Sequence, residues 1–335
     1  MDNDRERGQM KKTGIKIGVI GGGYWGKNLI RVFNEIGTLS AICDINNNLV
    51  EAYKNDYSGV DIVSSYETLI KNPEIDALVI ATPASTHYKI AKFAMENGKD
   101  VFCEKPLALT TRHGEELVKI ASDNKLILMV GHILHYHPAV EKLKQAVNQG
   151  ELGNIEYIYS NRLNIGRIRH EENILWSFAP HDISLMLSIA KSLPSEVYSY
   201  GGIFLPHKVE DVTLTFFSFP ENIKGHIFVS WLNPFKEQKF VVIGNKKMAV
   251  FDDMEKEKKL VFYQHKIKWN NNEIPTIEKA EAEVVDVEKE EPLKREANHF
   301  IECVSKRKKP YTDGEEALNV LKVLQQTEKC LRRKR

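Results

Sequence analysis

Cysteine is scarce in this sequence, and its distribution excludes two kinds of scaffold. The 335 residues include four cysteines that lie far apart: Cys43, Cys103, Cys303 and Cys330. They form no C-x-x-C pair and no metal-ligand spacing, so we expect neither a disulfide framework nor a metal site. Two of them fall in predicted buried strands, where a thiol packs as a small apolar side chain. This usage favours a reducing cytoplasm.

Charge of one sign is not in excess, and long apolar runs are missing. Lysine plus arginine number 47 and aspartate plus glutamate 46, so nothing points to nucleic acid or an anionic membrane as a partner. No apolar run is long enough to cross a bilayer, and the polar stretch 1–14 lacks the apolar core of a secretory signal. We expect a cytoplasmic protein with a polar N-terminal extension at 1–14.

A glycine-rich turn stands near the start of the chain. An apolar strand leads into Gly21-Gly22-Gly23-Tyr24-Trp25-Gly26, and apolar residues at helical spacing follow as far as Ile36. Gly21, Gly23 and Gly26 therefore form a G-x-G-x-x-G pattern between a strand and a helix, where dinucleotide-binding folds hold a pyrophosphate. A glycine-rich turn with no ligand is the alternative.

The next predicted strand supports the dinucleotide site. It covers residues 39–44 and ends in Asp44, roughly 20 residues after the glycines, where a carboxylate binds the adenosine ribose hydroxyls. Ile45 and three asparagines follow Asp44, so no basic residue is there to receive a 2′-phosphate. We predict NAD, in preference to NADP, as the cofactor.

The alternation of strands and helices predicts two domains, for which the chain is long enough. Residues 15–133 alternate apolar strands with helices, which is typical of a Rossmann domain with a doubly wound parallel sheet. Residues 134–335 change to period-two strands, which predict an α+β domain with a large, mostly antiparallel open sheet. The strands expected there are 155–161, 196–200, 212–219, 223–231, 239–243 and 248–251. One helix, at 182–191, interrupts them, and two helices at 292–306 and 315–333 close the chain and are candidates to pack back on the first domain.

Polar residues follow two of the predicted parallel strands, and ligands of such sheets lie at the carboxyl ends of the strands. Thr82, Pro83 and His87 follow the fourth strand, and Glu104 and Lys105 follow the fifth. Thr82 has an equally good alternative role as a helix cap. Lys105, held by a proline that is a candidate for a cis peptide bond, is well placed to reach a substrate.

The second domain carries two further candidate groups. His181 and Asp182 precede the helix predicted at 182–191, and either of them is expected to cap it. Upstream, a short loop concentrates polar and basic side chains: Arg162, Asn164, Arg167 and Arg169. A solvated basic loop is one interpretation, and a site for a carboxylate or diphosphate is the other.

Taken together, these motifs resemble the Gfo/Idh/MocA oxidoreductase family over nearly the whole chain. The motifs are Gly21-x-Gly23-x-x-Gly26, Ala81-Thr82-Pro83 with His87, Glu104-Lys105-Pro106, and His181 before a helix. The resemblance implies a Rossmann domain, a second domain with a large open sheet, and homo-oligomers, dimers or tetramers, built by packing those sheets.

The resemblance also implies roles for individual residues. Lys105 and His181 would be the active-site pair, with His181 our first choice as base and Lys105 the alternative. The residues expected around NAD are the three glycines, Tyr24, Trp25, Asp44, Thr82, Pro83, His87, Glu104 and Lys105. Those expected around the substrate are Lys105, Arg162, Asn164, Arg167, Arg169, Ser177, His181 and Asp182. Many members carry an aspartate at the position of Ser177 to orient the histidine, so the orienting group here is left open.

Within the family, the segments around Asn161, Trp176 and Trp231 resemble those of enzymes that oxidise the 3-hydroxyl of UDP-linked N-acetylamino sugar acids. The implied function is therefore an NAD-dependent dehydrogenase of surface-polysaccharide precursor synthesis. The alternatives are a keto-sugar reductase, a polyol or free-sugar dehydrogenase, and a regulator that senses NAD or a sugar without catalysis. Retention of both Lys105 and His181 disfavours the regulator.

Overall fold

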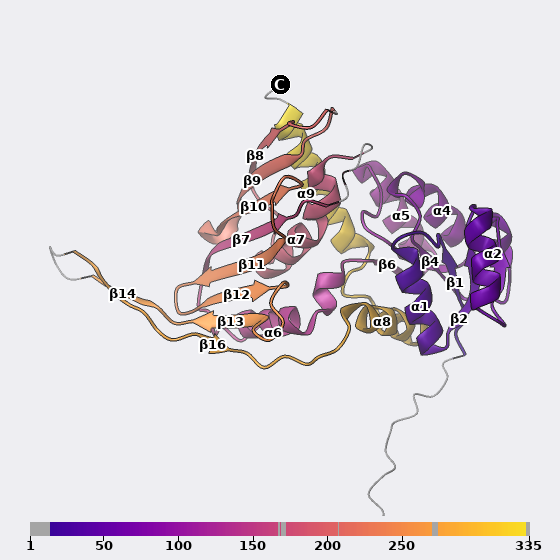
Figure 1. Ribbon diagram of the computed structural model, residues 1–335, viewed down its shortest axis with the longest axis horizontal. Helices are drawn as coiled ribbons and strands as arrows, with labels where there is room; N and C mark the ends of the chain where they lie inside the picture. Colours follow the sequence, from indigo (N-terminus) through magenta and orange to yellow (C-terminus); the bar gives the residue numbers. More distant parts are fainter. Residues whose placement is uncertain (1–13, 167, 169–171, 207, 270–273, 333–335) are drawn as a thin grey trace, which may run out of the picture. The chain divides into compact units, whose positions relative to one another are not determined.

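The chain forms two compact units in the computed structural model, which describes residues 14–166, 168, 172–206, 208–269 and 274–332 (Figure 1). The first unit runs to Ala108 and includes Arg112–Gly131 and Leu293–Gly314. The second comprises Leu109–Thr111, His132–Pro292 and the chain from Glu315 onward. The predicted extension, apart from Gly14, and two predicted site residues, Arg167 and Arg169, lie outside the described residues.

The first unit contains a six-stranded parallel sheet in the order β3-β2-β1-β4-β5-β6. Strands β1, β4, β5 and β6 are largely apolar and buried along their whole length, as predicted for a doubly wound parallel sheet. The strands are β1 (Ile17–Ile20), β2 (Leu39–Cys43), β3 (Asp61–Val63), β4 (Ala77–Ile80), β5 (Asp100–Cys103) and β6 (Leu128–Val130).

Helices pack on this sheet through apolar faces. Leu29, Ile30 and Phe33 of α1 are buried, and α1 packs on β1 and β2. Near the end of the chain, Phe300 of α8 lies 5.6 Å from Phe102 of β5 between ring centroids, so α8 belongs to the first unit. The helices of this unit are α1 (Gly26–Ile36), α2 (Asn47–Asp56), α3 (Tyr66–Lys71), α4 (Ala84–Glu96), α5 (Thr111–Asp123) and α8 (Pro292–Lys306).

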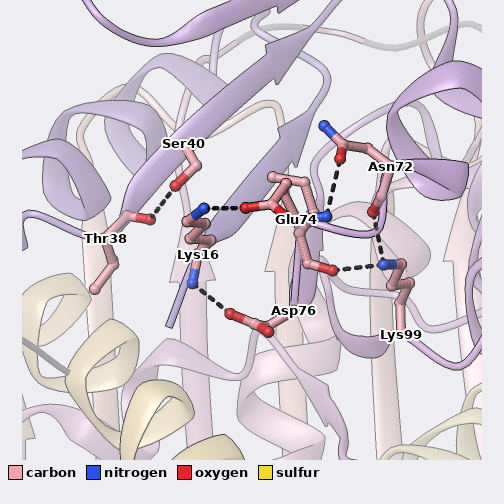
Figure 2. Close-up of polar contacts among 8 residues, drawn as sticks. Lys16, Thr38, Ser40, Asn72, Glu74, Asp76 and Lys99 are labelled. Carbon is pink, nitrogen blue, oxygen red and sulfur yellow. Dashed lines mark hydrogen bonds and ion pairs between the residues drawn. The ribbon is translucent and has the colours of Figure 1, made fainter. Parts of the chain in front are cut away.

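Polar contacts connect the segments at the amino ends of the parallel strands (Figure 2). Lys16, just before β1, donates from its backbone nitrogen to Asp76 at 2.7 Å and from its side chain to Glu74 at 2.5 Å. Lys99, just before β5, donates to the carbonyl oxygens of Asn72 and Ile75. These bonds join the segments that lead into β1, β4 and β5. Because the three strands are parallel, their carboxyl ends share the opposite edge of the sheet.

The second unit is built on an eight-stranded sheet in the order β16-β13-β12-β11-β7-β10-β9-β8. Neighbours pair antiparallel except β7 and β10, which confirms the mostly antiparallel sheet predicted. Its strands are β7 (Ile155–Leu163), β8 (Glu196–Gly202), β9 (Val212–Ser218), β10 (Lys224–Ser230), β11 (Glu237–Gly244), β12 (Met248–Asp252), β13 (Leu260–Tyr263) and β16 (Glu283–Val284). A separate hairpin pairs β14 (Lys266–Lys268) with β15 (Thr276–Glu278).

Helices cover one face of the eight-stranded sheet (Figure 1). Helix α7 (Ile174–Ala190) packs on β7, β9 and β10, and α6 (Pro138–Asn148) packs on β12 and β13. The residues that alternate with the helix-facing ones are more exposed and largely aromatic, and we call them the open sheet face: Tyr157, Tyr159, Tyr198, Tyr200, Phe216, His226 and Phe228. The unit is completed by the short helices η1 (Ile133–Tyr136) and η2 (Pro220–Asn222) and by α9 (Gly314–Arg332).

The expected start of the helix near His181 is wrong. Helix α7 begins at Ile174, and Asn173 is its N-cap, with a side chain that accepts from the backbone nitrogen of Trp176 at 3.2 Å. Pro180 lies inside the helix, where it removes one backbone hydrogen bond. The helix persists because twelve of its seventeen residues are buried, so packing outweighs the proline. His181 and Asp182 are therefore mid-helix residues and not caps.

Two smaller expectations also differ. The sequence pattern predicts a helix over 87–97 and a last parallel strand over 126–130, whereas α4 begins at Ala84 and β6 covers Leu128–Val130. The strands β13 to β16 had no predicted counterpart. Three of them have three residues or fewer, which is too short for an alternation of apolar and polar residues to identify a strand, and all residues of β14, β15 and β16 are exposed.

Helix α8 carries a fully buried glutamate, Glu296, whose carboxyl oxygens make no hydrogen bond to a described residue. Burial, together with the nearby Glu104, raises the pKa of Glu296 well above its usual range. The carboxyl group is thus neutral in the folded chain and ionised in the unfolded chain above about pH 4.3. Stability is therefore lost as pH rises from that value toward the folded pKa, by up to about 1.4 kcal/mol per pH unit.

We predict that Glu296→Gln, which cannot ionise, gains stability relative to the wild type between pH 5 and pH 7, by more than about 1 kcal/mol. Urea unfolding at both pH values measures the difference. Glu302→Gln on the same helix is the control. The lysines beside Glu302 lower its pKa to about 2, so it is ionised in both states over this range and its replacement has a pH-independent effect. A constant difference for Glu296→Gln would contradict the prediction.

Candidate active site

The glycine turn between β1 and α1 is closed by two contacts that leave no room for a side chain. A Cβ atom on Gly26 would lie 1.8 Å from the carbonyl oxygen of Gly21. A Cβ on Gly21 would lie 2.8 Å from the backbone of Ala81 and Thr82, and Gly21 has φ +96°. By contrast, a Cβ on Gly23 would meet nothing within 4 Å. The backbone at Gly23 is thus accessible to a phosphate group at the start of a helix.

Asp44 is attached to this turn. Its Oδ2 accepts from the backbone nitrogen of Gly22 at 2.7 Å, and its Oδ1 accepts from that of Asn46 at 2.8 Å. On the other side, the Tyr53 hydroxyl donates to the Gly22 carbonyl oxygen at 2.6 Å. Each carboxylate oxygen retains acceptor capacity, so the oriented Asp44 can still receive ribose hydroxyls. The chain therefore provides both parts of a dinucleotide site, a phosphate cradle and a ribose acceptor.

Glu104 connects the turn to the end of β5. Its Oε1 accepts from the Trp25 indole nitrogen at 2.6 Å, and its Oε2 accepts from the backbone nitrogen of Lys105 at 3.2 Å. Glu104 is buried, and a Cβ on Gly131 would lie 2.9 Å from its carboxylate. Lys105 is half-buried at the carboxyl end of β5, and its peptide bond to Pro106 is cis. Glu104 thus orders the backbone that presents Lys105.

His87 holds the loops after β4 and β5 together. Its Nδ1 lies 2.8 Å from the Pro106 carbonyl oxygen and its Nε2 lies 2.8 Å from the Thr82 carbonyl oxygen. Thr82 does not cap α4, because its hydroxyl bonds the Thr86 hydroxyl at 2.7 Å. Thr82 and the exposed Pro83 lie at the strand edge near Gly21, whereas both His87 nitrogens are occupied by backbone oxygens.

The second unit contributes His181, half-buried in the middle of α7. Ser177 lies one turn earlier and is buried. The ring of His132, the residue before η1, lies edge-on to the His181 ring, with 6.2 Å between centroids. His132 Nδ1 in turn lies 2.7 Å from Glu316 Oε2 in the first turn of α9. These three side chains come from separate parts of the chain and meet within one unit.

Asp182 and Arg162, both expected to meet substrate, are instead bonded to each other. Arg162 Nε donates to Asp182 Oδ2 at 2.6 Å, and its Nη2 donates to Oδ1 at 3.2 Å. Ser160 donates to the same carboxylate at 2.8 Å. Both side chains of the ion pair are nearly buried, so it joins α7 to β7 from inside the unit. Asn164 is half-buried just beyond β7, where its backbone nitrogen donates to Ser230 at 3.0 Å.

Several residues of these arrangements were not predicted: Tyr53, Gly131, His132 and Glu316. Gly131 and His132 follow β6, so their place at the carboxyl end of a parallel strand was an available signal. No local pattern links Glu316 to His132, because 184 residues separate them. Among the described residues, no group of three or more His, Cys, Asp or Glu side chains is arranged to hold a metal ion.

Comparison with known families matches both halves of the chain. Residues 15–132 match the model of the Gfo/Idh/MocA oxidoreductase family with its NAD-binding Rossmann fold, and residues 140–250 match the model of the Gfo/Idh/MocA C-terminal domain. The two matches together cover more than half of the chain. The first unit is accordingly an NAD-binding Rossmann domain.

Sequence relatives carry varied names. An uncharacterized oxidoreductase of Streptococcus pneumoniae serotype 4 is 33% identical over 44% of this chain and 40% of its own length. A 2,7-anhydro-N-acetylneuraminate hydratase of Mediterraneibacter gnavus is 28% identical over 58% of this chain and 53% of its own. The chain thus spans about half or less of these two relatives. A UDP-N-acetylglucosamine 3-dehydrogenase of Acidithiobacillus ferrooxidans is 24% identical over 92% of this chain and 94% of its own.

Solved structures share the fold over nearly the whole length. The UDP-N-acetylglucosamine 3-dehydrogenase of Acidithiobacillus ferrooxidans superposes with a TM-score of 0.83 at 23% identity, covering 95% of this chain and 97% of that one. A levoglucosan dehydrogenase in complex with NADH and levoglucosan gives a TM-score of 0.83 at 17% identity, covering 96% and 98%. At these identities the likeness establishes the common fold. Among the described residues, no helix is long and apolar enough to span a membrane.

We predict that the chain binds NAD at least about tenfold more tightly than NADP, a difference of about 1.4 kcal/mol. The Asp44 carboxylate accepts hydroxyl hydrogens and repels a 2′-phosphate. Calorimetric titration with both dinucleotides measures the ratio. The double variant Asp44→Ala, Ile45→Arg should reduce or reverse the preference for NAD. As a control, Asp61→Ala replaces an exposed aspartate at the start of β3 and should leave the preference unchanged. Equal affinities of the wild type would refute the assignment.

Proposed function

Because the chain belongs to the Gfo/Idh/MocA oxidoreductase family, we propose that it is an NAD-dependent dehydrogenase of a UDP-linked N-acetylamino sugar. The specific substrate we favour is the uronic acid form of UDP-N-acetylglucosamine, oxidised at its 3-hydroxyl in surface-polysaccharide precursor synthesis. This would make the protein a UDP-N-acetyl-2-amino-2-deoxyglucuronate 3-dehydrogenase. All four cysteines are free thiols, which is compatible with the reducing cytoplasm where such precursors are made.

One observation carries the choice of substrate class. The relative that matches 92% of the chain is named for oxidation of UDP-N-acetylglucosamine at position 3, whereas the first two relatives match about half of it. A match that extends through the second unit includes the residues that would contact the sugar. The uronate carboxylate is our addition, and it rests on the basic residues at Arg167 and Arg169, which the favoured substrate would need for its two anionic groups.

The proposed chemistry assigns a separate task to each side chain. Bound NAD would accept the hydride that leaves the sugar carbon. His181 takes the hydroxyl proton, because an imidazole is a base of suitable strength near neutral pH. The Lys105 ammonium group donates a hydrogen bond to the same hydroxyl oxygen and stabilises the negative charge that develops on it. Glu104 and Asp44 act earlier, by holding the loops that bind the dinucleotide.

Names among the relatives favour one alternative, a dehydrogenase of a free polyol. An inositol 2-dehydrogenase of Agrobacterium fabrum is 32% identical over 40% of this chain and 41% of its own length. That match is short. An uncharged polyol would also offer no anionic group to Arg167 and Arg169. A regulator without catalysis would have no use for Lys105 and His181, so we rank it last.

We expect purified protein with NAD to produce reduced nicotinamide absorbance with the UDP-linked uronate, faster than with UDP-N-acetylglucosamine or myo-inositol. His181→Asn should lower kcat by about 10²- to 10⁴-fold, the range for loss of a general base. Lys105→Met should lower kcat as well, and Lys119→Met, an exposed lysine on α5, should not. Faster turnover of inositol would select the alternative, and normal kcat in His181→Asn would remove its role as base.

We also propose that the open sheet face is the surface through which copies of the chain form a dimer or tetramer. Tyr198 and Tyr200 are 53% and 54% exposed, and Phe216 is 40% exposed beside them. The rings of Tyr159 and His226 stack at 5.2 Å on the same face. Apolar faces of this extent in folded proteins mark interfaces.

Light scattering at about 10 μM, well above the dissociation constants of stable assemblies, is expected to give the mass of a dimer or tetramer. Phe216→Glu places a charge on the open sheet face and should reduce the mass to that of a monomer. Leu193→Glu, an exposed leucine outside the strands, is the matched control and should keep the assembly. A monomeric wild type would show that this face serves another purpose.

A further inference from the structure

His181 has an acidic group behind it, with one histidine between them. The His132 ring lies 6.2 Å from the His181 ring between centroids, at an interplanar angle of 81°. This separation is that of aromatic rings in edge-to-face contact. On its other side, His132 Nδ1 lies 2.7 Å from Glu316 Oε2, and the His132 side chain is 2% exposed. The imidazole of α7 is therefore linked to the carboxylate of α9 through a buried ring.

The hydrogen-bond directions around Glu316 can be assigned. The Ser184 hydroxyl donates to Glu316 Oε1 at 2.5 Å, which uses its single hydrogen. His135 Nε2, 2.7 Å from the Ser184 oxygen, must then be the donor of that pair. His135 Nδ1 consequently accepts from Lys144 Nζ at 3.0 Å. The donors thus run in one direction, from Lys144 through His135 and Ser184 to Glu316 Oε1, which is the direction that suits a carboxylate.

Protonation states agree with this direction of bonding. Burial and the neighbouring Lys144 lower the pKa of His135 to about 3, so His135 is neutral and has one hydrogen to give. Burial alone would raise the pKa of Glu316, but its contacts with His132 and Ser184 lower it below its usual value. Glu316 is therefore an anion at neutral pH, with both oxygens fixed in direction.

The other charged groups around His181 are matched among themselves. Asp182 of α7 is neutralised by Arg162 of β7 at 2.6 Å. Lys144 of α6 contacts His135, and Glu141 on the same helix opposes its charge. Ser177, one turn before His181, has no charge to offer. Glu316 is the carboxylate in hydrogen-bond contact with His132, whose ring contacts His181.

We propose that His132 and Glu316 are positioning residues that hold the His181 imidazole in place and stabilise its protonated form. The proposal rests on the proposed function, since His181 gains a proton in the reaction only if it is the base. The negative charge of Glu316, on the far side of the buried His132 ring, stabilises the positive charge that forms on His181 when it takes a proton.

The first test needs no substrate. Histidine signals are titrated by NMR in the wild type, Glu316→Gln, Glu316→Asp and Glu315→Gln, with His181→Asn used to assign the resonance. Glu316→Gln should lower the apparent pKa of His181 by about half to one pH unit, with His132 and His181 fitted as a coupled pair. Glu316→Asp keeps the charge and should restore most of the shift. Glu315→Gln, the exposed neighbour on α9, should leave it unchanged.

The second test uses whichever sugar alcohol the protein oxidises. The acidic limb of the kcat/KM profile should move to lower pH by the same amount in Glu316→Gln, and kcat should fall roughly tenfold. If Glu316→Gln lowers the apparent pKa of His181 but the protein oxidises no sugar, the positioning role of His132 and Glu316 is supported and the proposed function is rejected. A folded Glu316→Gln protein whose His181 titrates within about 0.2 pH unit of the wild type would overturn the pair, whatever the substrate.

Discussion

The contact between Gly21 and Gly26 is the constraint on which the first unit depends. With no side chain at either position, the end of β1 and the start of α1 touch through backbone atoms, and Gly21 also touches the end of β4. The turn between them is thereby directed toward the carboxyl edge of the sheet. Asp44 accepts a hydrogen bond from the Gly22 nitrogen, and Tyr53 donates one to the Gly22 carbonyl oxygen. A phosphate cradle results from backbone geometry, with side chains that only orient it.

The second unit builds its part of the site in a different way. Helix α7 is buried almost all round, so a polar residue on it needs a partner inside the unit. Arg162 from β7 provides one for Asp182, and Glu316 from α9 provides one for Ser184. The site residues of this unit are fixed by packed elements, which restrains them more tightly than a loop would.

This difference explains how much the sequence could predict. The glycine pattern, the strand ending at Asp44 and the basic residue after β5 are local signals, and the structure places all three at one edge of the parallel sheet. The antiparallel sheet of the second unit was likewise predicted from alternation of apolar and polar residues. The start of α7 was not, because its proline suggested a boundary and the buried side chains that override it became evident only in three dimensions. The partnership of His132 with Glu316 depends on distant segments and has no local signature.

Arg162 shows how a difference of two residues in a strand boundary alters a functional interpretation. The pattern predicted a strand that ends at residue 161, which left Arg162 in a polar loop with the other arginines. In the structure β7 continues to Leu163, and its side chains alternate between the two faces of the sheet. Arg162 therefore shares the helix-facing side with Ser160, whereas Asn161 points to the other face and bonds Glu237. A guanidinium that already neutralises a buried carboxylate has little capacity for a substrate anion, since releasing it would leave Asp182 charged and buried. If the proposed substrate is correct, its anionic groups need other cations, and the sequence provides Arg167 and Arg169 as candidates beyond the end of β7.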